Sequence, residues 1–191
     1  MPTTIEEFDA VRITNFNIKF KGEQTAQSFG CVGQLEGETE MITIVKKCEG
    51  VETKSKSKPQ KMTLSLNAHV KVAPLRSIFG LSNEGLKPGV YSYGSNSKSK
   101  DFVLTADVID EFEDLTKLIA FPNCTSSTGL TLSIENGADE VAELELEFTA
   151  MVDDNKNCYY EALLDELADT TVAETWRTNF TPDLVKEVPA P

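Results

Sequence analysis

The sequence predicts a mainly β protein, an antiparallel β-sandwich or barrel with a short flanking α-helix. Three observations predict this fold class: apolar and polar residues alternate along long stretches, turn-forming clusters separate these stretches, and helical patterns are few. Many short strands combined with few helices are typical of sandwiches and barrels. A chain of 191 residues also has the length of one domain, so residues 1–191 are expected to build a single core.

Alternation is strongest in two segments, Met62–Val70 and Val141–Val152. In the second segment, Leu144, Leu146 and Phe148 share one face, and glutamates occupy the positions between and before them. Such a period of two is typical of a strand with one buried and one solvent-exposed face. Shorter or weaker forms of the same pattern predict strands at Arg12–Phe20, Phe29–Leu35, Met41–Lys47, Val90–Tyr93, Phe102–Val108, Lys117–Phe121 and Leu130–Ile134.

Helical signals are confined to two segments. Val72–Leu81 has a proline in its first turn and a glycine near its end, an arrangement that favours a short helix. Asp169–Phe180 is the second candidate, although its threonines and valine are poor helix formers. Cys158–Leu164 fits a strand or the start of a helix, and the turn-forming residues 153–157 before it favour a strand that follows a hairpin turn.

Two stretches are rich in Ser and Lys and poor in apolar residues. They are 51–61, VETKSKSKPQK, and 94–100, GSNSKSK. Segments of this composition bury too little apolar surface to offset the entropy cost of ordering the chain. We therefore expect a mobile loop near residues 51–61, a second loop at 94–100 and a frayed C-terminus at 187–191.

The net charge of −13 is distributed unevenly along the chain. Residues 1–100 hold 14 basic and 10 acidic side chains, whereas residues 101–191 hold 4 basic and 21 acidic ones. The acidic excess argues against a protein that binds nucleic acid tightly, because such binding comes mainly from Lys and Arg on phosphates. An asymmetry of this size is typical of proteins with an interaction role.

The sequence predicts neither secretion nor membrane insertion. The first ten residues lack a basic start and an apolar run, and no stretch approaches ~18 consecutive apolar residues. The cysteines are far apart, which argues against a zinc site and predicts reduced, buried thiols. They are Cys31, Cys48, Cys124 and Cys158.

No arrangement of residues points to catalysis. His69, the single histidine, lies on the polar face of a predicted strand, which favours an ordinary surface or interface residue. Gly30–Gly33 lacks the frame of a phosphate-binding loop, and residues 153–157 imitate a calcium loop only until a cysteine takes the place of its glycine. The acidic cluster Asp107–Asp114 lies between two predicted strands and is expected to be a solvated hairpin tip. We therefore expect no enzyme activity, no catalytic or metal-binding residue and no cofactor.

One acidic feature follows directly from the strand pattern. Glu143, Glu145 and Glu147 place three carboxylates on one face of a strand, ~7 Å apart. Aligned like charges repel one another, so this face must meet water or basic partners.

The second half of the chain carries a series of short, non-catalytic strings. They are Tyr91–Gly94 (YSYG), Phe102–Val108 (FVLTADV), Lys117–Cys124 (KLIAFPNC), Ile134–Gly137 (IENG), Glu143–Phe148 (ELELEF) and Tyr159–Ala162 (YYEA). In their order and spacing, the chain resembles the major tail tube proteins of long-tailed, siphovirus-type phages of Gram-positive bacteria. The first half resembles that family only in outline, as a strand, a basic loop, a long strand and a short helix.

This resemblance implies a β-sandwich or barrel of the phage tail tube type, similar in architecture to type VI secretion tube proteins. It implies a structural virion protein that assembles in the bacterial host cytoplasm into hexameric rings. The rings stack into a hollow tube through which DNA passes without specific binding. The implied partners are further copies of the chain and the tape-measure, tail terminator and distal tail proteins.

Two hypotheses connect this expectation with particular residues. The first is that Glu143, Glu145 and Glu147 face the lumen, because an acidic wall repels phosphates; the polar face of Thr63–Lys71 is the second candidate wall. The second is that the predicted basic loop contacts the next ring, for example at the acidic tip Asp110–Asp114. The basic residues of that loop are Lys54, Lys56, Lys58 and Lys61.

Two other functions stay open at this point. One is another virion component, such as a tail terminator or a capsid decoration protein. The other is a carbohydrate-binding β-sandwich, which would need exposed aromatic side chains for stacking on sugars. The candidates for such stacking are Tyr91, Tyr93, Tyr159, Tyr160 and Trp176.

Overall fold

The computed structural model describes residues 5–134, 136–137 and 141–187. Its strands are β1 (Ala10–Phe20), β2 (Gln27–Ser28), β3 (Gly30–Cys48), β4 (Val51–Val70), β5 (Phe102–Asp110), β6 (Thr116–Ser126), β7 (Leu144–Met151) and β8 (Tyr160–Leu163). Its helices are α1 (Val72–Phe79) and α2 (Thr171–Asn179), with short 3-10 turns at Leu164–Glu166 and Pro182–Val185. The prediction of a mainly antiparallel β fold with a short helix is confirmed.

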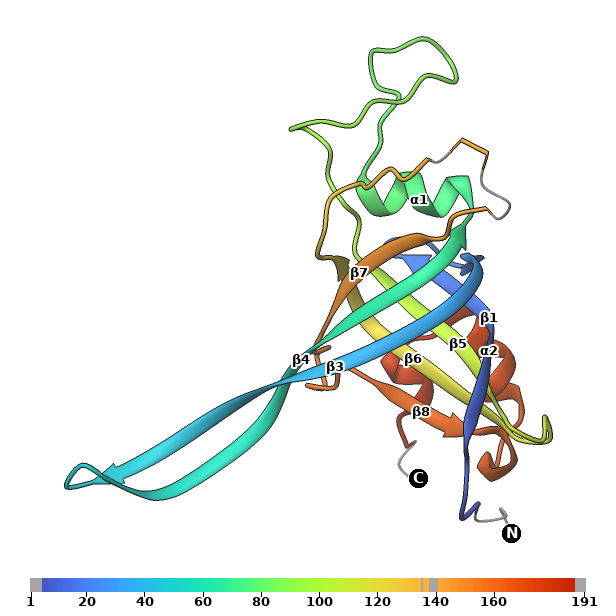
Figure 1. The fold of residues 1–191 in the computed structure, drawn as a ribbon. Helices are drawn as coiled ribbons and strands as arrows, with labels where there is room; N and C mark the ends of the chain where they lie inside the picture. The colour runs from blue at the N-terminus through green and yellow to red at the C-terminus, as the bar shows by residue number, and fades with distance from the viewer. Residues whose placement is uncertain (1–4, 135, 138–140, 188–191) are drawn as a thin grey trace.

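The strands form one antiparallel sheet that curls into a barrel (Figure 1). Their order is β2-β1-β5-β6-β7-β4-β3, and β8 pairs with β6 outside this path. The two ends of the order approach each other where the Phe29 N–H donates a hydrogen bond of 3.0 Å to the Phe16 carbonyl. One side of β6 is shared, because residues 124–126 pair with β7 and residues 117–120 pair with β8.

Aromatic side chains fill the interior of the barrel. Phe148 packs edge to face on Phe102, with ring centroids 5.0 Å apart, and on Phe29, at 6.3 Å. Edge-to-face pairs of this kind add to the free energy gained by burying the rings. Helix α1 lies across one end of the barrel, where its Ile78 and Phe79 join the same core (Figure 1).

Gly80 ends helix α1 in the left-handed conformation, at φ 67°. A Cβ atom at this position would lie 2.1 Å from the carbonyl oxygen of Lys98, so no other residue fits. The glycine therefore both stops the helix and allows the 94–100 segment to pass close beside it.

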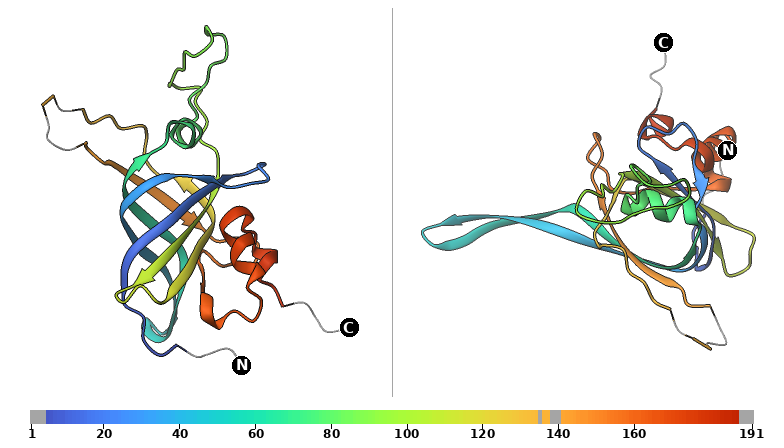
Figure 2. Two further views of the ribbon diagram at one scale, coloured as in Figure 1. Left: turned by 90° about the vertical axis from the view of Figure 1, so that its right-hand side faces the viewer. Right: turned by 90° about the horizontal axis from the view of Figure 1, so that it is seen from above.

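Helix α2 packs on the outside of the barrel, over β5 and β6 (Figure 2). Trp176 is buried there and donates its Nε1–H to the Ile119 carbonyl, at 3.2 Å. At the end of the helix, the buried Lys19 Nζ donates to the Asn179 side chain at 2.7 Å and to the Phe180 carbonyl at 2.8 Å. Burial lowers the pKa of Lys19, and its ammonium caps the carbonyl of Phe180, the residue that ends the helix.

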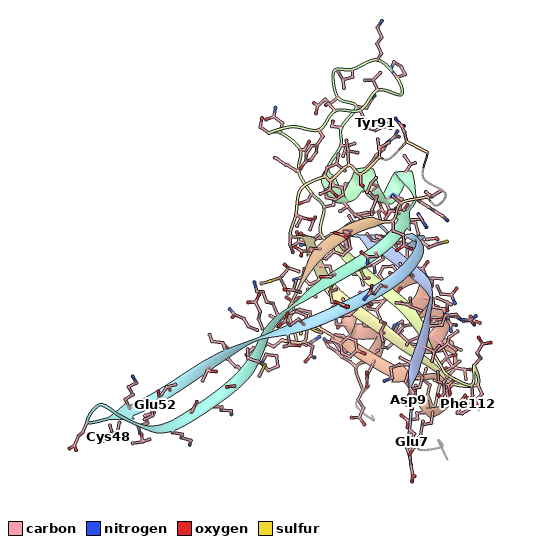
Figure 3. All side chains as sticks on the ribbon, viewed as in Figure 1. Glu7, Asp9, Cys48, Glu52, Tyr91 and Phe112 are labelled. Atoms are coloured by element: carbon pink, nitrogen blue, oxygen red, sulfur yellow. The ribbon has the colours of Figure 1, made fainter. Side chains whose placement is uncertain are left out.

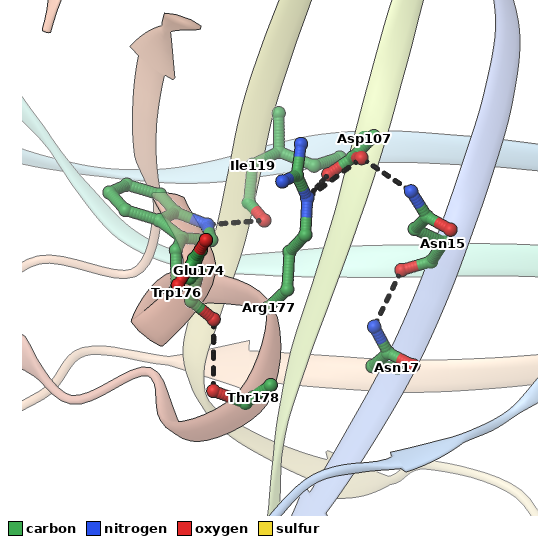
Figure 4. A network of polar contacts seen from close by, with 8 residues as sticks. All are labelled: Asn15, Asn17, Asp107, Ile119, Glu174, Trp176, Arg177 and Thr178. Carbon is green, nitrogen blue, oxygen red and sulfur yellow. Dashed lines mark hydrogen bonds and ion pairs between the residues drawn. The ribbon is translucent and has the colours of Figure 1, made fainter. Parts of the chain in front are cut away.

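A buried carboxylate ties α2 to two strands (Figure 4). Asp107 of β5 accepts hydrogen bonds from Arg177 Nε at 2.9 and 3.1 Å and from Asn15 Nδ2 of β1 at 2.6 Å. The carboxyl group of Asp107 is 4% exposed, whereas the Arg177 side chain is 31% exposed. The prediction that Asp107–Asp114 forms a solvated tip is therefore wrong for Asp107, which needs its partners because it has lost water, and also for Asp110, which is buried.

The Asp107→Ala variant is expected to lower the free energy of unfolding by about 2–4 kcal/mol, because Arg177 and Asn15 lose their acceptor. In urea unfolding, Asp107→Ala and Arg177→Ala should be non-additive by at least about 0.5 kcal/mol. The matched control is the exposed Asp165→Ala, with a change within about 0.5 kcal/mol. Additive effects of the two variants would contradict a direct contact.

The largest correction concerns residues 51–61, predicted as a mobile loop. They form the first half of β4 and pair with β3, for example Ile44 with Lys56, in a ladder that shifts register after Glu40 and after Lys46. The predicted strands Phe29–Leu35 and Met41–Lys47 are one strand, β3. Main-chain hydrogen bonds form such a ribbon without a need for apolar side chains. The low apolar content of residues 51–61 therefore gave no indication of a strand.

Other strand predictions also need correction. Leu130–Ile134 is not a strand, and Val90–Tyr93 holds only a bridge between Ser92 and Ser82. Residues 153–157 do form a turn, with the Asp153 N–H bonded to the Asn157 carbonyl, but β7 and β8 pair with β6 instead of with each other. Both helices were predicted correctly to within a few residues. The part of the expected frayed end at 188–191 lies outside the described residues.

The cysteines are less buried than expected. Cys31 and Cys48 are exposed, Cys158 is half-buried and only Cys124 lies in the core. Burial raises the pKa of the Cys124 thiol, so that thiol stays protonated. Cys31 and Cys48 lie near the two ends of β3.

Candidate functional site

The outer face of strands β3, β4 and β7 carries a sheet of polar side chains. Each row across it runs through the three strands: Glu36 pairs with Ser65, which pairs with Glu147, and Asn67 pairs with Glu145. We call Glu36, Glu38, Glu145 and Glu147 the acidic face; all four side chains are exposed. The uncharged segment 63–67 of β4 separates the two acidic rows by ~10 Å, two inter-strand spacings, which reduces their mutual repulsion.

The predicted alternation of β7 is confirmed. Leu146 and Phe148 are buried in the barrel, and Glu145 and Glu147 point outward. Glu143 behaves differently, because it precedes the strand and its Oε1 lies 3.9 Å from His69 Nε2. The polar face of Thr63–Lys71, considered above as a separate wall, belongs to the same surface as Glu145 and Glu147.

Half of the acidic face was missed by the sequence analysis. Glu36 and Glu38 lie on β3, in the string EGETE, whose alternation would have revealed an outward row. Glu36 accepts a hydrogen bond of 2.6 Å from Gln34, and Glu40 forms an ion pair of 3.1 Å with Lys61. The acidic surface therefore extends across β7, β4 and β3 and is not confined to β7.

Beyond Glu40 and Lys61, β3 and β4 leave the barrel as a two-stranded ribbon, residues 41–59, which we call the arm (Figure 1). All of its residues are exposed, including large apolar ones: Met41 at 52%, Ile44 at 60% and Val51 at 67%. An isolated two-stranded hairpin is marginally stable in water. The arm therefore presents apolar surface that only a partner can cover.

Four of the five lysines of the arm share one face. Cross-strand pairs join Ile42 with Lys58, Ile44 with Lys56 and Lys46 with Lys54, so these six side chains point the same way. The opposite face has no net charge, because Lys47 is paired there with Glu52, and it includes the hydroxyl contact of 2.8 Å between Thr43 and Ser57. One residue of the predicted basic group lies outside the arm: Lys61 is at its base and pairs with Glu40.

The turn between β5 and β6, residues 111–115, is acidic and well ordered by hydrogen bonds. Asp110 is 5% exposed, and its Oδ1 accepts from the N–H groups of Asp114 and Leu115, each at 3.1 Å. Burial acts to raise the pKa of Asp110, but these donors outweigh it and lower the pKa. The hydrogen bond with Asp110 raises the pKa of Asp114. Phe112 at the centre of the turn is 77% exposed.

The residues considered for other chemistry are engaged in the fold. Asp153 Oδ1 accepts the N–H groups of Asn155 and Asn157, at 2.8 and 3.0 Å, and so stabilises a turn. Trp176 lies on the buried face of α2 and has no exposed ring face on which a sugar could stack. Within residues 5–134, 136–137 and 141–187, no three His, Cys, Asp or Glu side chains gather as a metal site. In the same ranges, no helix has the length and hydrophobicity needed to span a membrane.

Two solved structures show a distant likeness to this chain. No protein-family model and no curated protein matches the chain. A chain of the anti-feeding prophage cap, the tube-terminating cap, is similar over 84% of this chain and 95% of that one, at 12% identity and a TM-score of 0.45. A chain of the six-fold symmetrised anti-feeding prophage baseplate is similar over 85% and 97%, at 10% identity and a TM-score of 0.41. At TM-scores below 0.5, neither likeness decides the fold or the function.

Proposed function

We propose that this protein is a structural virion protein, the major tail tube protein of a long-tailed phage or phage-like particle. Six copies close into a ring, and the rings stack into a tube that conducts DNA. The observation that carries the proposal is the arm, residues 41–59, whose apolar and basic side chains are all exposed. The series of strings that resembles tail tube proteins supports the same function.

The arm favours self-assembly over binding of a small ligand. It exposes Ile42, Ile44 and Val51 beside lysines, so its partner must offer both apolar surface and carboxylates. The chain itself carries 21 acidic side chains in residues 101–191. A contact between two different surfaces of identical copies closes into a ring when its rotation closes and otherwise continues as an open stack, so contacts of this kind can build both the rings and the tube. Under this proposal, the further partners of the protein are the tape-measure, tail terminator and distal tail proteins. The protein assembles in the host cytoplasm and becomes part of the virion.

Assembly is tested directly by concentrating the purified protein and examining it by electron microscopy and sedimentation. We expect regular tubes, with less polymer in 1 M than in 0.1 M NaCl, because salt screens contacts between lysines and carboxylates. A protein that stays monomeric would overturn the proposal. Discrete rings that do not stack would favour the second candidate, a tail terminator or another virion component.

The acidic face is proposed to line the lumen, where carboxylates repel the phosphates of passing DNA. Tubes of the variant Glu145→Lys/Glu147→Lys are expected to retain DNA that is present during assembly and to protect it from nuclease. The matched control Asp165→Lys/Glu174→Lys makes the same charge change on exposed residues of the α2 side. Equal protection by the two variants would show that the acidic face does not line the channel.

A further inference from the structure

We propose that the tip of the β5–β6 turn of one copy inserts into the groove beside α1 of the next copy, and that this contact stacks the rings. The inference rests on the proposed function and names the surfaces that meet along the tube axis. We call residues 111–114 the tip. The groove is the hollow between α1, residues 81–84 and residues 91–100.

The tip is a preformed projection with an exposed aromatic ring at its centre. The hydrogen bonds from Asp114 and Leu115 to Asp110 fix its shape, so it loses little conformational entropy when it binds. Phe112 is flanked by Glu111 and Glu113, and Glu113 also forms a surface ion pair of 3.3 Å with Arg12. An exposed phenylalanine in a rigid acidic turn is suited to anchoring in a pocket with a basic rim.

The groove offers such a rim. It is an open hollow of about 950 Å³, in which Arg76, Lys98 and Lys100 provide positive charge and Glu84 is the acidic residue. Its floor includes Tyr91, whose ring lies 3.8 Å below the guanidinium of Arg76. Among the residues that the structure describes, the three cations of the groove form no ion pair.

Hydrogen bonds within the chain also hold the segments around the groove in place. The Asn83 side-chain amide donates to the carbonyl of Lys87 at 2.9 Å, and main-chain hydrogen bonds of 2.9 and 3.2 Å join Ser82 with Ser92. The Leu130 N–H donates to the Tyr93 hydroxyl at 3.4 Å, which attaches this segment to the neighbouring connection. The long connection between α1 and β5 therefore forms a defined wall.

The tip and the groove lie at opposite ends of the molecule. Figure 3 shows Phe112 at the end away from α1 and Tyr91 at the end beside α1. A contact between opposite ends of identical copies joins two different surfaces and leaves both outer ends free, so it can continue from copy to copy as an open stack. The second copy is the occupant we assign to the groove, because its acidic, aromatic tip complements the basic rim. Because the tip binds in the groove, the lysines of the arm are expected to contact carboxylates outside the tip.

Charge exchange between the two surfaces tests the proposal. Glu111→Lys/Glu113→Lys and Lys98→Glu/Lys100→Glu are each expected to lower the amount of sedimentable tube at least tenfold in 0.1 M NaCl. A chain that carries all four changes restores opposite charges and is expected to recover at least half of the wild-type amount. The control Asp165→Lys/Glu174→Lys should assemble like the wild type. Failure of the combined variant to recover while it still folds would overturn the proposal.

Removal of the aromatic anchor gives an independent measurement. Phe112→Ala is expected to leave rings intact in electron microscopy and to reduce their stacking at least tenfold, whereas Phe112→Trp should preserve stacking. Wild-type tubes together with normal stacking of Phe112→Ala would overturn this inference alone. A wild-type chain that forms no assembly at all would instead overturn the proposed function.

Discussion

Replacing residues 43–57 by the two-residue turn Asn-Gly is expected to abolish tube formation while the barrel remains folded. The new turn joins Ile42 to Lys58, which already face each other across the ribbon, and Asn-Gly is the preferred two-residue hairpin turn. No residue of the arm is buried, so its loss removes contacts between copies and spares the core. Electron microscopy should show no tubes, and circular dichroism should show a cooperative thermal transition.

Two full-length variants separate the charge of the arm from its length. Lys54→Glu/Lys56→Glu/Lys58→Glu reverses the basic face and is expected to prevent assembly at low salt. Ser55→Lys/Ser57→Lys adds charge to the opposite, neutral face and should assemble more strongly than the reversed variant. Normal tubes from the shortened chain would contradict the role given to the arm.

Phe148→Ala is expected to produce the largest loss of stability among the single substitutions considered. The ring is fully buried and packs between Phe29 and Phe102, so truncation leaves a cavity at the centre of the barrel. Such truncations cost about 3–5 kcal/mol. For a domain of this size, that corresponds to a fall of about 10 °C in Tm, measured by calorimetry.

An exposed phenylalanine of the same chain provides the matched control for this prediction. Phe112→Ala removes the same ring from a side chain that is 77% exposed, and its Tm is expected to change by less than about 2 °C. Similar losses in the two variants would show that the aromatic cluster does not form the core. The same pair separates folding from assembly, because Phe112→Ala is expected to fold normally and fail to stack.

Alternation predicted the strands in which one face is buried and the other is wet. Met62–Val70 and the β7 ladder are of this kind, because the barrel core selects every second side chain. Residues 51–61 gave no such signal, since both faces of the arm are exposed and neither is selected by a core. Leu130–Ile134 shows the reverse error: it alternates, yet Leu132 and Ile134 are 80% and 85% exposed and pair with no strand.

For similar reasons, only part of the candidate site could be predicted from the sequence. Glu145 and Glu147 could be placed by counting along one strand, whereas joining them to Glu36 and Glu38 required the order β7-β4-β3. Asp107 was assigned to a solvated tip because its partner Arg177 is 70 residues away in the chain. Short-range patterns show which side chains share a strand face, and long-range pairing decides which faces meet.

The position of β7 in the chain also sets the order in which the surfaces appear during synthesis. The ribbon of β3 and β4 pairs locally and can form within microseconds of leaving the ribosome. The acidic face needs β7, whose last residue is Met151, about 90 residues after the arm ends. At ~5–20 residues per second, that interval is roughly 5–18 s. A nascent chain therefore exposes the apolar and basic surface of its arm seconds before β7 completes the acidic face.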